Sequence, residues 1–183
     1  VDADTHPQTL AVLATRAEPI GIEIELYDPR DEVPPVEVFG ALLSNPGSSG
    51  VVWDAGPAIQ ALHDQGAVVA VATDLLACAV LQPPGEQGAD IVVGSHAHRL
   101  QGAGRLGSAF VGYGLGNFVF YTAGGPGTDT GVLTVTATGR RIDRYDWSPA
   151  RISGGIPRPA AGTDAANRLA QWNALRGCTG LAP

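Results

Sequence analysis

The sequence predicts an α/β fold with a three-layer, mainly parallel sheet and crossover helices, continued by a C-terminal β meander and a final helix. Strand-like and helix-like patterns alternate through residues 1–95, which is typical of parallel strands joined by helices. From residue 109 to residue 147 the segments are strand-like and show no helical period. A length of 183 residues suits one domain, so we expect a single domain, with alternating strands and helices at 1–95 and a β-rich segment at 96–183.

The chain opens with a predicted helix. Thr5 and Gln8 have the spacing of a capping box, and Pro7 suits a first helical turn. We therefore expect a helix that ends before Pro19. The patterns that follow predict, in order, a half-buried alternating strand, an acidic proline-rich loop and a second strand: 21–26, 28–35 and 38–43.

The rest of the first segment alternates between helix and strand. A turn rich in Gly, Ser and Pro at 45–50 precedes a helix that Asp54 should cap and Gly66 should end. Asp74 is the expected N-cap of an apolar helix at 75–81. The short apolar runs around these helices predict buried strands: 67–72 and 90–93.

The second segment is predicted to be mostly β structure. The composition of Thr138-Gly139-Arg140 predicts a hairpin turn, and a final amphipathic helix should be capped by Thr163 or Asp164. The predicted strands are 109–113, 117–121, 131–138 and 141–147. The apolar face of the final helix consists of Ala166, Leu169, Trp172 and Leu175.

Composition excludes several classes of function. The formal net charge is −7 and the pI is near 4.9, which disfavours nucleic acid and anionic membrane surfaces as partners. No apolar run approaches the roughly 20 residues that span a bilayer, so we expect a soluble protein with no membrane association. No signal-peptide pattern opens the chain and no initiator Met is present, which suggests a trimmed chain and leaves the compartment undetermined.

Lysine is missing from the sequence. All eleven basic residues are arginines, so no Schiff base with a lysine amine can form within this chain. The two cysteines have no metal-ligand spacing and are expected to be plain thiols, with Cys78 buried in an apolar run and Cys178 in an exposed tail.

The principal candidate site is the turn that follows the predicted strand at 90–93. There His96 and His98 stand two residues apart, and on extended backbone they would face the same side at the carboxyl end of a parallel strand. Neutral imidazole is a common metal ligand, so the pair could bind a divalent ion. The alternative is a pair of solvated loop histidines.

A second pair of ligand-type residues occurs near the start of the chain. Asp4 and His6 match the Asp-x-His motif of metallophosphoesterases, and with His96 and His98 they could supply four ligands for Zn or Mn. No Gly-Asp and no Gly-Asn-His occurs to provide the bridging carboxylate and the acid of that family. The alternative is that residues 4–6 introduce the first helix.

Several segments of the first half carry a family resemblance. In order, they are 4–9 (DTHPQT), 15–19 (TRAEP), 46–50 (PGSSG), 72–77 (ATDLLA), 83–86 (PPGE) and 88–91 (GADI). With these segments, residues 1 to about 95 resemble part of the N-terminal half of the glycine decarboxylase P-protein, a pyridoxal-phosphate enzyme. The resemblance implies that Asp74 occupies a position that can face the cofactor's pyridine nitrogen.

The second half carries a different resemblance. Residues 88–98 (GADIVVGSHAH) and 114–120 (GLGNFVF) are similar to the C-terminal part of CapA-type proteins of capsule or poly-γ-glutamate synthesis, which have a metallophosphatase-like fold. This resemblance implies that His96 and His98 help bind metal, and that Asn117 lies near the site. Residues 89–95 satisfy both families, so we predict an engineered or selected chimera joined at this strand. The alternative is a natural fusion of partial domains.

The sequence therefore predicts a folded hybrid with no intact native activity, no bound cofactor and no known partner. One alternative is a weak metal-dependent phosphoesterase that uses Asp4, His6, His96 and His98, with Zn or Mn. Another is a structural module that forms a homodimer through an unpaired edge strand. The two parent families imply different compartments: cytoplasmic or mitochondrial for the first and extracytoplasmic for the second.

Overall fold

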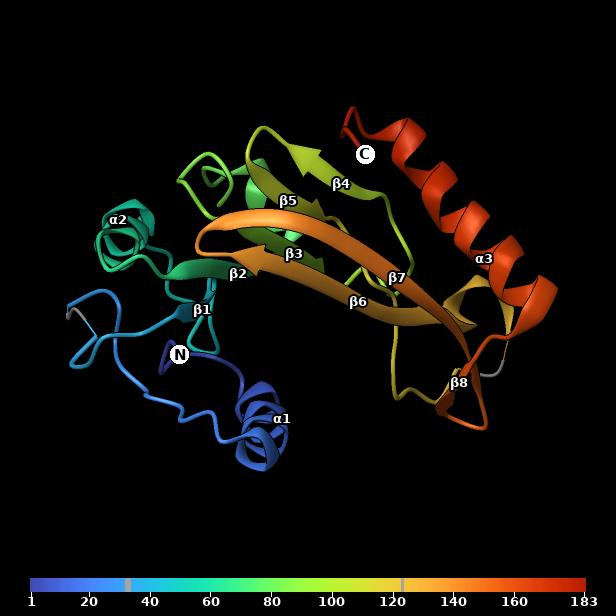
Figure 1. The fold of residues 1–183 in the computed structure, drawn as a ribbon, viewed down its shortest axis with the longest axis horizontal. Coiled ribbons are helices and arrows are strands. Elements are labelled where there is room, and N and C mark those ends of the chain that lie inside the picture. The colour runs from blue at the N-terminus through green and yellow to red at the C-terminus, as the bar shows by residue number, and fades with distance from the viewer. Residues whose placement is uncertain (32–33, 123) are drawn as a thin grey trace.

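The computed structural model describes residues 1–31, 34–122 and 124–183, which form two sheets and three α-helices (Figure 1). The first sheet has five strands in the order β1-β2-β3-β5-β4, with β5 parallel to β3 and antiparallel to β4. The second sheet is an antiparallel meander in the order β6-β7-β8.

The strands of the first sheet are β1 (Gly40–Ser44), β2 (Val68–Asp74), β3 (Ile91–Ser95), β4 (Ala103–Leu106) and β5 (Ala109–Gly112). Those of the second are β6 (Asp129–Thr138), β7 (Arg141–Ser153) and β8 (Ile156–Pro159). The α-helices are α1 (Pro7–Ala17), α2 (Gly56–Asp64) and α3 (Gly162–Leu175). Short 3-10 helices are η1 (Glu18–Ile20), η2 (Leu75–Ala79), η3 (Gly125–Thr128) and η4 (Arg176–Cys178).

Two apolar clusters cover opposite faces of the five-stranded sheet. Successive residues of a strand point to opposite faces, and Val92 of β3 belongs to one cluster while its neighbour Ile91 packs on the other. The first cluster lies between the sheet and α2, where Ile59 and Leu62 are fully buried. The second lies between the sheet, the meander and α3. The three layers are therefore α2, the mainly parallel sheet and the meander with α3.

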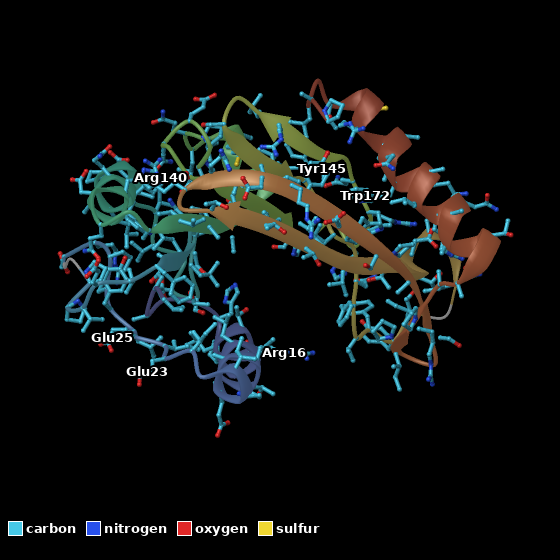
Figure 2. The ribbon with its side chains drawn as sticks, in the orientation of Figure 1. Arg16, Glu23, Glu25, Arg140, Tyr145 and Trp172 are labelled. Atoms are coloured by element: carbon cyan, nitrogen blue, oxygen red, sulfur yellow. The ribbon has the colours of Figure 1, made fainter. Side chains whose placement is uncertain are left out.

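The second cluster is built on aromatic rings. Phe110 of β5 is fully buried, with its ring centroid 4.7 Å from that of Tyr145 on β7. Trp147 of β7 stacks on Trp172 of α3 at 5.0 Å with an interplanar angle of 9°. Figure 2 shows Tyr145 and Trp172 together in the space between the meander and α3. Trp172 is the buried residue of α3 and fixes this helix to the meander.

The predicted fold class is confirmed, and so are several local predictions. The hairpin turn between β6 and β7 contains Gly139, which has a φ of 55°. The Asp74 carboxylate accepts a hydrogen bond from Leu76 N at 2.9 Å and caps η2, as predicted. The described part of the predicted loop 28–35 is irregular; residues 32–33 of that loop lie outside the described residues.

Two predicted strands are wrong. Residues 21–26 form no strand, because the free edge of β1 is already used: Asp2 N donates to Leu42 O, and Ser44 N donates to the Asp2 carboxylate. The alternating side chains of this segment therefore find no sheet, and Leu26 is 50% exposed. Residues 117–121 also form no strand, because the Asn117 side chain and carbonyl bond to the loop and strand that follow.

The existence of the three α-helices was predicted, but the residues that cap their N-termini were not. The Thr5 hydroxyl bonds to the Ser44 hydroxyl at 3.0 Å instead of capping α1, which starts after His6. α2 starts after Ala55, although Asp54 still accepts a hydrogen bond from Gly56 N at 2.9 Å. α3 starts after Ala161, so Thr163 and Asp164 lie inside it.

Burial was also overestimated in places. The predicted helix at 75–81 is the short η2, and Leu76 within it is 78% exposed. Cys78 is half-buried, not buried, whereas Cys178 is exposed as predicted. β2 alternates between buried and half-buried side chains, since the meander leaves one of its faces partly uncovered. β4 and β8 were not predicted.

Candidate functional site

The carboxyl ends of four parallel strands meet at one edge of the five-stranded sheet. β1 ends at Ser44, β2 at Asp74 and β3 at Ser95, and the register places Asp74 beside Ser95. Open parallel sheets bind ligands in the crevice outside this edge. All four predicted metal ligands lie on segments near it, before α1 or directly after β3.

Asp4 and its neighbour Asp2 hold the turn after β1. Asp2 is 2% exposed and accepts hydrogen bonds from Asp4 N at 2.8 Å and Ser44 N at 3.0 Å. The Asp4 carboxylate accepts hydrogen bonds from Ser49 N at 3.0 Å and Ser49 Oγ at 2.6 Å. These bonds from Ser49 hold the pKa of Asp4 below its usual value. Both carboxylates therefore act as acceptors for the backbone and the hydroxyls of the turn.

His6 joins the same turn. Its Nδ1 shares a hydrogen bond with Ser48 Oγ at 2.7 Å, and Ser48 N donates to Asp4 O at 2.7 Å. A Cβ at Gly47 would overlap the Asp4 carboxylate, so the close approach of the two segments requires glycine there. Residues 4–6 thus clamp the turn at 46–49.

His96 and His98 are exposed, and neither has extended backbone. Their φ angles are 73° and 53°, in the left-handed region, so the expectation that extended geometry puts both rings on one side is wrong. The ring centroids are nevertheless 5.8 Å apart, and the ring of His98 lies 5.0 Å from that of Phe120. The two imidazoles are therefore close together although the backbone between them is not extended.

Asn117 orients the ring of His98. Its Nδ2 donates to Gly127 O at 2.9 Å, which leaves Oδ1 facing His98. His98 Nδ1 lies 2.6 Å from that oxygen and donates to it, so the neutral ring has its lone pair on Nε2. This second-layer bond is the kind that orients histidine ligands in metal sites.

The four predicted ligands are not gathered around one point. The structure places Asp4 and His6 on the clamp after β1, and His96 and His98 on the loop after β3. In the described ranges, no three side chains of His, Cys, Asp or Glu are close enough to share a metal ion. Each pair is local, and a bound ion at either pair would need further ligands from water or substrate.

Sequence reasoning missed the most connected buried carboxylate, Asp90. Asp90 Oδ2 accepts hydrogen bonds from Val69 N and His63 Nε2, both at 2.9 Å. Its Oδ1 lies 3.3 Å from an Arg140 guanidinium nitrogen, and its carbonyl accepts from Phe110 N at 2.9 Å. Figure 2 shows Arg140 at the end of the β6–β7 hairpin nearest to α2. A charged residue directly before an apolar strand was the available signal.

The first part of the chain is similar to proteins of known family. The profile of the family "Glycine cleavage system P-protein" matches residues 1–115, which is more than half of the chain. The chain belongs to this family. The resemblance predicted for residues 1 to about 95 is confirmed, and the P-protein match continues past it across β4 and β5.

Individual P-proteins agree closely with part of the chain. It is 56% identical over 95 residues to glycine dehydrogenase (decarboxylating) of Gluconobacter oxydans (strain 621H), covering 52% of this chain and 10% of that protein. The same values hold for the enzyme of Rhodopseudomonas palustris (strain BisA53), and that of Bradyrhizobium diazoefficiens is 55% identical over the same length. The chain thus spans about a tenth of these relatives.

A solved structure also matches. The crystal structure of glycine decarboxylase (P-protein) of the glycine cleavage system, in inhibitor-bound form, is 24% identical with a TM-score of 0.47. The match covers 80% of this chain and 33% of that one. Separately, no helix in the described ranges has the length and apolarity needed to cross a membrane.

Proposed function

We propose that this chain is a folded hybrid scaffold that joins a P-protein segment to a CapA-like segment and has no decarboxylase activity of its own. Its residues do not fit the pyridoxal-phosphate cofactor that the family implies. Covalent pyridoxal chemistry needs a lysine amine, and the sequence contains no lysine. Asp74, the expected partner of the pyridine nitrogen, accepts the hydrogen bond of the η2 cap.

The observation that carries this proposal is one core shared by both segments. Leu181, which lies beyond the P-protein match at 1–115, belongs to the same buried cluster as Leu43. Phe110, inside the match, lies in one buried cluster with Trp147 and Trp172 outside it. Asp90 adds a polar link, because it binds α2, β2, β5 and the β6–β7 turn. A chain joined in this way should fold as a unit.

Thermal and urea unfolding of the whole chain test the scaffold proposal. We expect one cooperative transition by both far-UV circular dichroism and tryptophan fluorescence, since Trp53 reports the first segment and Trp147 the second. A truncated chain of residues 1–95 should lose that transition. Two separate transitions in the whole chain would contradict the proposal.

Decarboxylation is tested separately. Mixing the chain with pyridoxal phosphate should give no Schiff-base absorbance band beyond that of the N-terminal amine, and no release of CO2 from glycine. A variant with Val1 blocked by acetylation is the control for the N-terminal amine. Sustained CO2 release would overturn this part of the proposal.

A second candidate is a divalent-metal site at His96 and His98, of the kind a weak phosphoesterase would use. It is favoured by the bond from His98 to Asn117, which leaves His98 Nε2 free to ligate an ion. Zn or Mn binding should fall about 10-fold to 100-fold in Asn117→Ala, the range typical of lost second-layer bonds. Isothermal titration with each metal measures this, and unchanged affinity in His98→Gln would refute the site.

His6 separates the two versions of the metal site. If His96 and His98 bind the ion alone with water, His6→Gln should keep the affinity of the parent chain. If Asp4 and His6 also contribute, the same variant should lose affinity to the extent that His98→Gln does. Phosphomonoester hydrolysis with added Mn then reports whether a bound ion is catalytic.

The proposal of a homodimer rests on β6. This strand of ten residues lies at one edge of its sheet, and beyond Asp129 it contains no charged residue and no proline. Long edges without such protection are templates for pairing with another chain. Sedimentation at two concentrations should show a dimer that Thr134→Lys weakens, and a monomer at all concentrations would rule it out.

A further inference from the structure

The β7–β8 hairpin places two arginines directly opposite each other. Its turn, Gly154-Gly155, has φ angles of 60° and 79°, as a two-residue type I′ turn requires. The register of this turn pairs Ser153 with Ile156 and therefore Arg151 with Arg158. Directly opposite side chains lie on one face of the sheet with Cβ atoms about 5 Å apart.

The two guanidinium groups are not neutralised by protein partners in the described part of the chain. Both side chains are exposed, and neither forms an ion pair or hydrogen bond there. Like charges in opposite positions of an antiparallel pair are destabilising. A bound anion would therefore relieve the repulsion between the two guanidinium groups.

The nearest carboxylates are already engaged. Asp129 stands opposite Arg151 on β6, but its Oδ1 accepts from Arg168 Nη1 at 2.6 Å. Asp164 accepts from Arg168 Nε at 2.9 Å. With three guanidinium groups against two carboxylates, this corner has a net charge of +1. Residues 96–183 together contain nine arginines and four acidic residues, so the surrounding field is also positive.

Both arginines line one open hollow of about 910 Å³. Its polar lining also includes Ser153, Thr122, Thr128 and Asp164. The hollow is formed by the meander, the residues before η3 and the start of α3, and its lining residue Tyr121 stacks on Phe120, whose ring lies 5.0 Å from that of His98. Its volume exceeds that of a phosphate group, which leaves room for an organic substituent.

We propose that this hollow binds a phosphate dianion, either inorganic phosphate or the phosphate group of a small monoester. Guanidinium forks match the oxygens of phosphate in pairs, and a dianion neutralises both unpaired arginines where a monocarboxylate would neutralise one. Ser153 offers a hydroxyl donor on the same face as Arg151, two residues along β7. The assignment is independent of the scaffold and metal proposals.

Titration of the whole chain with inorganic phosphate tests this proposal. Phosphate should raise the thermal midpoint more than sodium chloride at matched ionic strength, and calorimetry should give a 1:1 complex. Arg151→Gln and Arg158→Gln should each weaken binding about tenfold or more, as expected for a lost charge-assisted pair. Arg144→Gln is the matched control, since Arg144 is an exposed arginine of β7 that pairs with Asp146.

A second readout distinguishes a binding site from general charge effects. At low salt without phosphate, Arg158→Gln should be at least as stable as the parent, because like-charge repulsion is removed. Glycerol phosphate binding more tightly than inorganic phosphate would identify a monoester as the ligand. An equal effect of phosphate and chloride, acetate binding as tight as phosphate, or equal loss in Arg144→Gln would overturn the proposal.

Discussion

The two segments of the chain differ most in charge. Residues 1–95 contain fourteen acidic residues and two arginines, whereas residues 96–183 contain four acidic residues and nine arginines. The formal charges are therefore −12 and +5. Opposite fields favour the packing of the meander onto the parallel sheet, and the contact between Arg140 and Asp90 is the local form of that attraction. Apolar contacts then fix the geometry, because they, unlike charge, depend on shape.

The segments also differ in how their polar groups are used. In the first, Asp2, Asp4 and Asp90 are bonded to backbone amides, hydroxyls and a histidine within the fold. In the second, Arg151 and Arg158 are exposed and have no side-chain partner among the residues that the structure describes. Buried or bonded polar groups stabilise a fold, whereas unpaired exposed charges are available to ligands. The acidic groups of the first segment therefore hold local structure, whereas the exposed arginines of the second are available to a ligand.

The largest loss of stability is expected in the aromatic cluster of the second segment. Trp172→Ala removes the ring that stacks on Trp147 and should lower the free energy of unfolding by about 4 kcal/mol. Urea denaturation measures this loss, and hydrogen exchange should show α3 released first. Leu169→Ala on the same helix is the control and should cost under about 1 kcal/mol, since Leu169 is 38% exposed. Equal costs would refute the role of the stacked pair.

The next effect is expected at Asp90, which links the parallel sheet to the turn between β6 and β7. Asp90→Ala leaves His63 and Val69 N without their buried acceptor and should cost about 3 kcal/mol by urea denaturation. Asp146→Ala, which removes an exposed partner of Arg144, should cost under about 1 kcal/mol. If Asp90→Ala behaved like Asp146→Ala, the parallel sheet and the β6–β7 hairpin would be held together by apolar contacts alone.

The clamp in the first segment should be less sensitive. Gly47→Ala puts a Cβ onto the Asp4 carboxylate and should lower stability by about 2 kcal/mol through displacement of the turn. Gly177→Ala meets open space and should change stability by less than about 0.5 kcal/mol. A shift of the His6 ring resonances in proton NMR, with the resonances of other residues unchanged, would confirm that the clamp has moved and the rest of the fold has not.

The smallest effect is a loss of stability at high pH. Burial raises the pKa of Tyr27 to about 12 from its usual 10, so the folded state disfavours the phenolate. Between pH 10 and pH 12 the unfolded state can ionise Tyr27 while the folded state cannot. The free energy of unfolding is therefore highest below pH 10 and falls by roughly 1–2 kcal/mol as the pH rises toward 12. Tyr27→Phe should remove this dependence in urea titrations at several pH values. Identical pH profiles for parent and variant would show that another group controls alkaline unfolding.

The regular parts of both segments could be predicted from sequence, and the local contacts could not. The apolar run of β2 and the turn at Gly139 have strong local signals, so their positions follow from periodicity and turn chemistry. Residues 21–26 have an equally strong alternation but no strand to pair with, because Asp2 occupies the edge of β1. Strand formation there depends on a competitor far away in sequence. β8 contains two prolines, which hide an edge strand from sequence patterns.

The candidate site shows the same division. His96, His98 and Asn117 were predicted as site residues from motif and resemblance, and the structure shows that His98 Nδ1 lies 2.6 Å from Asn117 Oδ1. Metal binding there stays a prediction. The opposed arginines were not recognised, since their proximity depends on the register of a hairpin that was not predicted. Asp4 and His6 were assigned to metal from spacing alone, which does not report that Ser48 and Ser49 are their partners.

The position of Leu181 in the first apolar cluster has a consequence during protein synthesis. Leu43, Ile59 and Val69 leave the ribosome early, but the cluster that buries them also includes Val111 and Leu181. The first segment therefore emerges with part of its apolar surface in water and keeps it there until translation has passed residue 181. During that interval the nascent chain offers an apolar surface of the kind that chaperones bind.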